Sequence, residues 1–283
     1  MFIKITYNNC FISKLSIMAR QEGPFRFNGR IGDISFYYDK DRGWLARVKG
    51  GPTDTQIKTS PKMAGTRNGN SEFGRMSTTA KRLRQKFGAI LIAHSDSGMV
   101  NRFNSRISRI QKADPINERG KRRFLTANSR MLQGFEFNKQ HTLESLFMGR
   151  LVLAYDRETS QAVLDIPAFN PRSVVKATED ATHMEFIFIG TDLDVQNEGR
   201  QTDAVVHSQY IPLIGDFPGE RLSITVPAEE ECAVGTVVGV RFYQEVNGQK
   251  YLARDKEYHA LQIKEVFLPV QNESSTAMDS TIN

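Results

Sequence analysis

The sequence predicts an α+β protein in which an N-terminal β-hairpin and a three-helix region precede an antiparallel, immunoglobulin-like β-sandwich. Between about residues 70 and 135, apolar residues recur every three or four positions, which is the period of a helix with one buried face. From about residue 141 the apolar period falls to two, and seven or eight short β-type segments follow. That number of strands in about 130 residues is typical of a sandwich of immunoglobulin-like size.

The N-terminal part reads as one hairpin followed by a loop. Residues 25–49 carry β-forming side chains on both sides of a turn at Asp39 to Gly43. Gly50, Gly51 and Pro52 end this unit. Residues 53–70 are rich in polar and turn-forming types, so composition predicts a loop there.

Apolar spacing predicts three helices, near residues 70–90, 98–111 and 118–133. In the first, Phe73, Met76 and Ala80 begin the apolar face. Pro115 separates the second helix from the third. We expect the three helices to pack together, with the hairpin beside them.

Turn residues divide the C-terminal strands, and Asn247-Gly248 is the strongest hairpin signal in the chain. The sequence therefore predicts four parts. They are a tail or start-site extension (1–17), a basic hairpin-plus-helical domain (18–140), an acidic β-sandwich domain (141–270) and a disordered tail (271–283).

Charge is divided unequally along the chain. The formal net charge is +6, but residues 1–150 hold 28 Lys and Arg against 11 Asp and Glu, a balance of +17. Residues 151–283 hold 10 against 21, a balance of −11. A basic half of this size points to an anionic partner, which is a nucleic acid, another protein, or the acidic half of the same chain or of a second copy.

The basic residues of the helical region recur at helical spacings, beside each apolar face. Guanidinium groups on a rigid helix can hold carboxylates or phosphates in two-pronged fashion, whereas a single charged face more often serves solubility alone. The candidate anion- or partner-binding residues are Arg75, Arg82, Lys86, Arg102, Arg106, Arg109, Arg119, Lys121, Arg122, Arg123 and Arg130.

No motif points to catalysis or to a cofactor. Gly69 to Gly74 has the glycine spacing of a phosphate-binding loop but lacks the following Lys and Ser or Thr. The five histidines are far apart in sequence and form no HExxH pair, and no GxSxG element is present. We therefore expect a non-enzymatic protein with no catalytic residues and no cofactor.

Metal binding and export are not expected either. Asp192, Asp194, Asn197 and Glu198 could gather oxygen ligands for calcium, but their spacing is not that of an EF-hand, and Asp and Asn are common in turns. The two cysteines form no CxxC pair. The chain has no apolar run of about 18 residues, and its N-terminal stretch lacks a continuous apolar core, so a cytoplasmic location is expected.

Several segments between residues 23 and 171 resemble an uncharacterised family of bacterial proteins that open with a Gly-basic-Ile-Gly hairpin and end with an Ig-like β-sandwich. The matching segments are 29–37 (GRIGDISFY), 66–68 (TRN), 71–75 (SEFGR), 134–138 (GFEFN) and 166–171 (IPAFNP). The resemblance implies that both halves form one evolved unit. It implies no activity and no site residues, and the segment before Met18 falls outside it.

Two function classes follow from these observations. The first is an interaction or assembly protein whose basic helical half docks on an acidic protein surface, including head-to-tail self-association into a homo-oligomer. The alternative is a sequence-independent nucleic-acid-binding protein that uses the Arg and Lys stripes. Glu229, Glu230 and Glu231 form an acidic loop that could receive the basic half.

Overall fold

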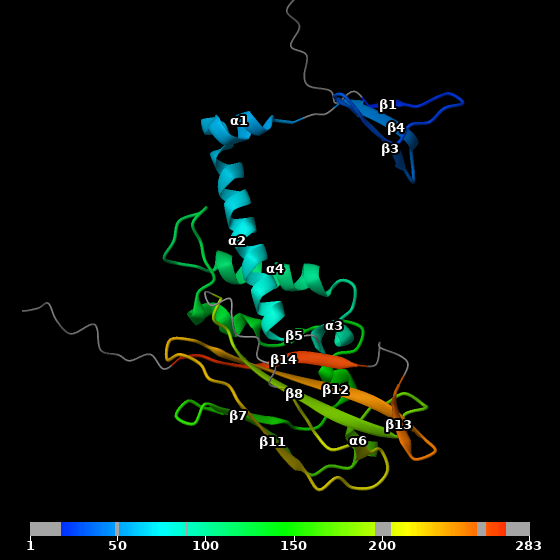
Figure 1. The fold of residues 1–283 in the computed structure, drawn as a ribbon, viewed down its shortest axis with the longest axis vertical. Helices are drawn as coiled ribbons and strands as arrows, with labels where there is room; N and C mark the ends of the chain where they lie inside the picture. The colour runs from blue at the N-terminus through cyan, green and yellow to red at the C-terminus, as the bar shows by residue number, and fades with distance from the viewer. Residues whose placement is uncertain (1–17, 49–50, 89, 196–204, 254–258, 270–283) are drawn as a thin grey trace, which may run out of the picture. The chain divides into compact units, whose positions relative to one another are not determined.

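The computed structural model describes residues 18–48, 51–88, 90–195, 205–253 and 259–269 (Figure 1). The chain divides into two compact units, residues 1–66 and 67–283. The expected boundary at residues 140 and 141 instead falls inside the second unit, because the helices after residue 66 share a core with the C-terminal sheet. The expected tails, 1–17 and 271–283, lie outside the described residues.

The first unit contains an antiparallel sheet with the strand order β1-β4-β3-β2. Its strands are β1 (Met18–Arg20), β2 (Gly29–Ile31), β3 (Ile34–Asp39) and β4 (Gly43–Val48). The turn between β3 and β4 lies where the sequence placed it. The carboxylate of Asp39 accepts the backbone N–H groups of Asp41 and Arg42 there.

The loop expected over residues 53–70 is wrong. Helix α1 (Asp54–Thr59) and the short 3₁₀ helix η1 (Pro61–Met63) lie within it. A capping box starts α1, because the Thr53 side chain accepts the N–H of Gln56 while the Gln56 side chain accepts the N–H of Thr53. Polar residues that suggest a loop by composition here supply the caps that begin a helix.

Helix α2 (Ala64–Lys86) begins earlier than expected and includes Gly69 to Gly74, so this glycine-spaced segment is helical and is no phosphate-binding loop. The short α3 (Ile90–His94) and then α4 (Met99–Lys112) follow. Helix α4 lies where the apolar spacing predicted it.

The third predicted helix, near 118–133, is wrong. Residues 114–125 form a loop, and only a 3₁₀ helix, η2 (Thr126–Leu132), follows it. Asp114 organises the loop by accepting backbone N–H groups from Ile116, Asn117 and Arg123 at 2.8–3.1 Å. Desolvation raises the pKa of Asp114, but these hydrogen bonds and one from the Asn117 side chain outweigh it and lower the pKa to about 2.

The rest of the second unit is mainly antiparallel β-structure, which confirms the α+β class. Its elements are β5 (Phe135–Glu136), α5 (Leu143–Leu146), β6 (Val152–Asp156), β7 (Gln161–Ile166), α6 (Pro171–Val174), β8 (His183–Asp192), β9 (Val205–His207), β10 (Ile211–Pro212), β11 (Glu220–Thr225), β12 (Val234–Val246), β13 (Gln249–Leu252) and β14 (Ala260–Phe267). Asn247 and Gly248, with φ of 52° and 78°, make the expected tight turn between β12 and β13.

Two sheets and the helices form the layers of the second unit (Figure 1). One sheet has the order β10-β8-β12-β14-β5, with β9 beside β8 and β13 beside β12, and the other has the order β11-β7-β6. One core lies between the two sheets and includes Phe186, Val238 and Leu222. The other core lies between the larger sheet and the helices and includes Phe103 and Ile263. The larger sheet is therefore covered on both faces, which explains the nearly continuous apolar run of β8.

Candidate anion-binding surface

Helix α4 presents a row of arginines along one flank of its buried face. Phe103, Ile107 and Ile110 are fully buried against the helical core. Arg102, Arg106 and Arg109, at spacings of four and three, line a hollow of about 530 Å³ between α4 and the segment that contains β5. This set of predicted residues is therefore brought together on one surface.

The three arginines of this row differ in how they are held. Arg102 donates to the carboxylate of Asp96 at 2.7 Å and to the backbone carbonyls of Glu136 and Phe137 at 3.2 Å each. Arg106 donates to the carbonyl of Met131 at 2.8 Å. Arg109 is exposed and has no ion pair with any described residue. Arg102 therefore stabilises the fold, whereas Arg109 is free to contact a partner.

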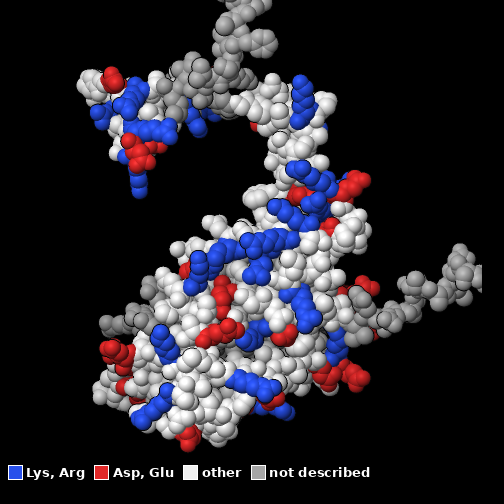
Figure 2. Space-filling model, turned by 180° about the vertical axis from the view of Figure 1, so that it is seen from behind, with Lys and Arg blue, Asp and Glu red and all other residues white. Residues whose placement is uncertain are grey.

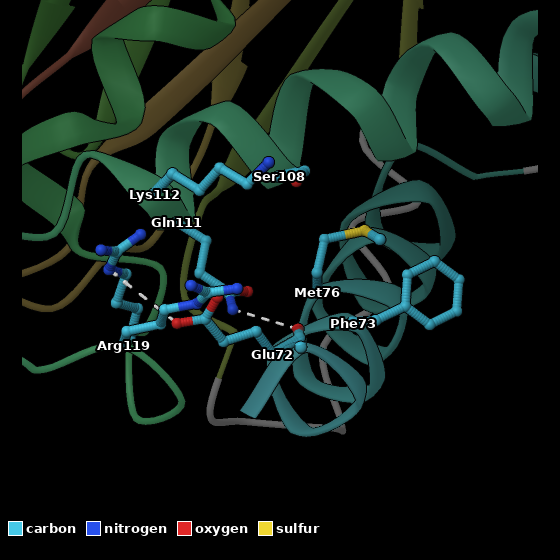
Figure 3. A pocket seen from close by; sticks show the side chains of 9 residues that line it. Glu72, Phe73, Met76, Ser108, Gln111, Lys112 and Arg119 are labelled. Carbon is cyan, nitrogen blue, oxygen red and sulfur yellow. Dashed lines mark hydrogen bonds and ion pairs between the residues drawn. The ribbon is translucent and has the colours of Figure 1, made fainter. Parts of the chain in front are cut away.

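A second hollow, of about 460 Å³, lies on the other flank of α4 (Figure 3). Helix α2 contributes Phe73, Met76 and Glu72, and α4 contributes Ser108, Gln111 and Lys112. The loop after α4 contributes Arg119 and Arg122.

Glu72 fixes that loop against α2. Its carboxylate accepts the N–H of Gly120 at 2.7 Å and lies 3.9 Å from Arg122. Its backbone carbonyl accepts a bond from Gln111 at 3.0 Å. Lys112 and Arg119 make no ion pair with a described residue and remain exposed beside the hollow.

The cations around these two hollows form what we call the α4 basic surface, defined as Arg106, Arg109, Lys112, Arg119 and Lys139. Figure 2 shows Lys and Arg side chains gathered in a band across the helical layer, at the level of α4. None of the five forms an ion pair with a carboxylate among the described residues. Lys112 and Lys139 were not among the predicted residues. Lys112 follows Arg109 by three positions, and this helical spacing could have placed it in the same set.

The stripe expected on α2 is not a free surface. Arg75 donates to the backbone carbonyls of Gly120 and Arg122. Arg82 donates to the carbonyl of Val195 at 2.7 Å, and Lys86, only 5% exposed, pairs with the carboxylate of Asp192. These three predicted residues therefore tie α2 to neighbouring segments.

The last predicted set lies on the irregular segment 114–132 and forms no helical stripe. Arg119, Arg123 and Arg130 are exposed, whereas Arg122 is half-buried beside Glu72. Lys121 is exposed and lies 3.9 Å from Glu118. Phe73, expected in the core, is 64% exposed at the second hollow.

Two histidines that are far apart in sequence lie together in the core. His94 of α3 and His259, just before β14, are almost fully buried with ring centroids 5.6 Å apart. The His94 Nδ1–H donates to the carbonyl of Ile90 at 2.7 Å, and Nε2 accepts from Arg241 at 2.7 Å. Neither ring nitrogen of His259 makes a hydrogen bond with a described residue. Burial, together with the charge of Arg241, lowers the pKa of both histidines to about 4.

Arg241 continues this polar group along the sheet. On β8, the Glu185 carboxylate accepts the hydroxyl of Tyr243 at 2.7 Å and lies 3.3 Å from Nδ1 of His207. Burial and Glu185 raise the pKa of the Tyr243 hydroxyl. None of these residues lines either hollow described above, so we assign the group a structural role.

The carboxylates considered for calcium are used otherwise. Asp192 pairs with Lys86 and accepts the N–H of Asp194, while Asn197 and Glu198 lie outside the described residues. Across the part of the chain that the structure describes, no three His, Cys, Asp or Glu side chains are placed to hold a metal ion. Within the same residues, no helix combines the length and apolarity needed to cross a membrane. Comparison with known proteins finds no matching family model and no matching curated protein.

Proposed function

We propose that this is a non-enzymatic interaction protein whose α4 basic surface docks on an acidic surface of a partner. The observation that carries the proposal is that Arg109, Lys112 and Arg119 are exposed and unpaired among the described residues, on a helix and a hydrogen-bonded loop. The helix and the loop fix the backbone positions of these cations, and complementary charge speeds association and selects the partner.

A second copy of the chain can supply the acidic surface. Glu229, Glu230 and Glu231, between β11 and β12, are exposed and have no ion pair with a described residue. Docking of this acidic loop on the α4 basic surface of another copy is a heterologous contact, which closes into a ring or extends into a filament. Charge complementarity between the two patches supports this head-to-tail arrangement.

Charge reversal tests the proposal. In light scattering of the full chain, association at about 20 mM salt should fall at about 300 mM salt, because salt screens exposed charges. Arg109→Glu with Lys112→Glu should abolish it, whereas Arg150→Glu with Arg172→Glu, a matched change elsewhere, should not. Mixing the α4 variant with a Glu229→Lys and Glu230→Lys variant should restore pairs, because one intact contact remains between unlike copies. A strict monomer at low salt and high concentration would refute self-association.

Sequence-independent nucleic-acid binding is the second candidate, and Phe73 favours it. Its exposed ring lies on the opposite side of the hollow from Lys112 and Arg119 (Figure 3), so a single strand that crosses the hollow could stack a base on the ring and place phosphates against the cations. Fluorescence polarisation with a labelled single strand should show an affinity that falls steeply with salt, and Phe73→Ala should weaken it. Docking on an acidic protein surface should not respond to Phe73→Ala. No binding at about 50 mM salt would remove this candidate.

We infer that the two sheets of the second unit form an immunoglobulin-like sandwich. In that fold, A, B and E lie in one sheet and C, F and G in the other. The order β6-β7-β11 corresponds to A-B-E, and β8-β12-β14 corresponds to C-F-G. Loops at the ends of such sandwiches commonly carry binding residues, which supports an interaction role.

A further inference from the structure

The sheet of the first unit has one face that is apolar and free of charge. The strand register pairs Ile34 with Val48, Phe36 with Ala46 and Tyr38 with Trp44, so all six side chains lie on the same face. Ile31 of β2 pairs with Ile34, and the Phe27 ring lies 5.8 Å from Phe36. We call these residues the aromatic sheet face: Phe27, Ile31, Ile34, Phe36, Tyr38, Trp44, Ala46 and Val48.

No described residue of the first unit covers this face. Ile31 is 61% exposed and Tyr38 57% exposed, and Phe27, Ile34 and Val48 are also exposed. Among the described residues 18–48 and 51–66, Leu45 alone is buried, and it lies on the opposite face. A sheet of short strands gains stability from a covered apolar face, so this unit is incomplete by itself.

The two faces of the sheet differ in charge. The opposite face carries Arg30 and Arg47, which are both register partners of Ser35, and Arg20, the partner of Leu45. The aromatic sheet face carries no Asp, Glu, Lys or Arg. A charged partner would therefore find no complementary group there, whereas an equally apolar and uncharged surface would fit.

The exposed area of this face is large enough for a stable contact. A fully exposed aromatic side chain presents about 150–250 Å², and a large aliphatic one presents less. Five of the eight residues are 41–61% exposed and the other three are half-buried, so the face offers roughly 500–600 Å² in each copy. Two such faces would bury roughly 1,000–1,200 Å², which reaches the roughly 1,000 Å² expected of a specific interface.

We propose that the aromatic sheet face packs against the same face of a second copy of this chain, which gives a two-fold symmetric dimer. Identical faces match in area and polarity, and sheets pack face to face about 10 Å apart with interdigitating side chains. This contact uses a different surface and a different force from the docking of the α4 basic surface. Burial of apolar area is not weakened by salt, whereas charge pairing is.

The chain provides its own reporter and a matched pair of variants. Trp44 is the only tryptophan and lies on the aromatic sheet face. Ile34 and Ser35 are adjacent in β3 but lie on opposite faces, so Ile34→Lys and Ser35→Lys place the same charge on the two sides. Tyr38→Lys is a second variant at an exposed position of the face, and far-UV circular dichroism checks that each variant folds.

Sedimentation equilibrium of the full chain at about 300 mM salt should show a dimer, and Trp44 emission should shift to the red as dilution separates the copies. Ile34→Lys and Tyr38→Lys should weaken the dimer at least tenfold, while Ser35→Lys and the charge reversal at Arg109 and Lys112 should leave it unchanged. A chain that stays monomeric at every concentration overturns the inference. The same holds if Trp44 emission is blue-shifted in that monomer and does not change on dilution, because the face would then be covered by another part of the same chain. A dimer that salt or the α4 variant disrupts would instead support the charge-based contact alone.

Discussion

The buried histidine pair predicts how the stability of the fold responds to acid. His94 and His259 are 2% and 1% exposed, and their pKa values are about 4, whereas a histidine in the unfolded chain titrates near 6.5. Between these values the unfolded chain binds more protons than the folded chain, so stability falls as the pH falls. Each histidine should therefore cost about 2 kcal/mol between pH 7 and pH 5, and about 3 kcal/mol by pH 4.

Replacing His259 isolates its share of this loss. Neither of its ring nitrogens is hydrogen-bonded to a described residue, so His259→Leu removes two buried unsatisfied atoms and places an apolar side chain of similar size in the core. At pH 7 the variant should be as stable as the wild type or more stable by about 1–3 kcal/mol. Between pH 7 and pH 5 it should lose about 2 kcal/mol less than the wild type does.

Urea unfolding at pH 7, 6 and 5 measures both quantities, because the comparison of variant and wild type cancels the titrating groups that do not interact with His259. His94 does interact with it, and the charge of His259 lowers the pKa of His94, so the difference includes that coupling. His141→Gln, which changes a histidine outside the pair, is the control for the loss of a histidine as such. An unchanged pH dependence in His259→Leu would refute the assignment of the acid response to this histidine. A variant that is less stable at pH 7 would show that His259 gains more from its surroundings than its unpaired nitrogens cost.

Three further outcomes follow from individual contacts. Desolvation raises the pKa of Glu136 to about 7. The carboxyl group ionises in the unfolded chain before it does in the folded chain, so its burial lowers stability increasingly as the pH rises from about 4.5 to 7. Urea unfolding at pH 8 should therefore show Glu136→Gln to be more stable than the wild type by roughly 1–2 kcal/mol. Lys86→Met should cost about 3–5 kcal/mol by leaving the Asp192 carboxylate buried and unpaired, and adding Asp192→Leu should recover most of that loss. Gly190→Ala should cost about 1–3 kcal/mol, seen as a lower Tm, because its new methyl group would meet the side chain of Val226.

Local patterns predicted the parts of the fold whose geometry they set directly. The apolar spacing placed α4 to within a residue, and Asn247-Gly248 placed the turn between β12 and β13. The predictions from composition and spacing were wrong where short polar side chains form hydrogen bonds with the backbone. Thr53 caps a helix that looked like a loop, and Asp114 holds in a loop a segment that looked helical.

The candidate surface was predictable only in part, for a related reason. Helical spacing shows which cations share a side of a helix, and it correctly grouped Arg102, Arg106 and Arg109. It cannot show what lies opposite that side in the folded chain. Arg82 meets a carbonyl 113 residues away and Lys86 a carboxylate 106 residues away, so their internal roles appear only in the structure. The pairing of His94 with His259 was hidden in the same way.

The unequal charge of the two halves therefore predicts a larger basic surface than the structure shows. The cations that remain unpaired among the described residues indicate where a partner can bind. With α2 tied to internal partners, the α4 basic surface is the part of the predicted stripes that combines a shaped hollow with unpaired charge in the described chain. It can pair with an acidic loop, which is a heterologous contact, whereas the aromatic sheet face pairs with itself and closes after two copies. If both contacts form, low salt should give assemblies larger than a dimer, and high salt should reduce them to the apolar dimer. The salt dependence of the assembly size thus separates the two forces in a single measurement.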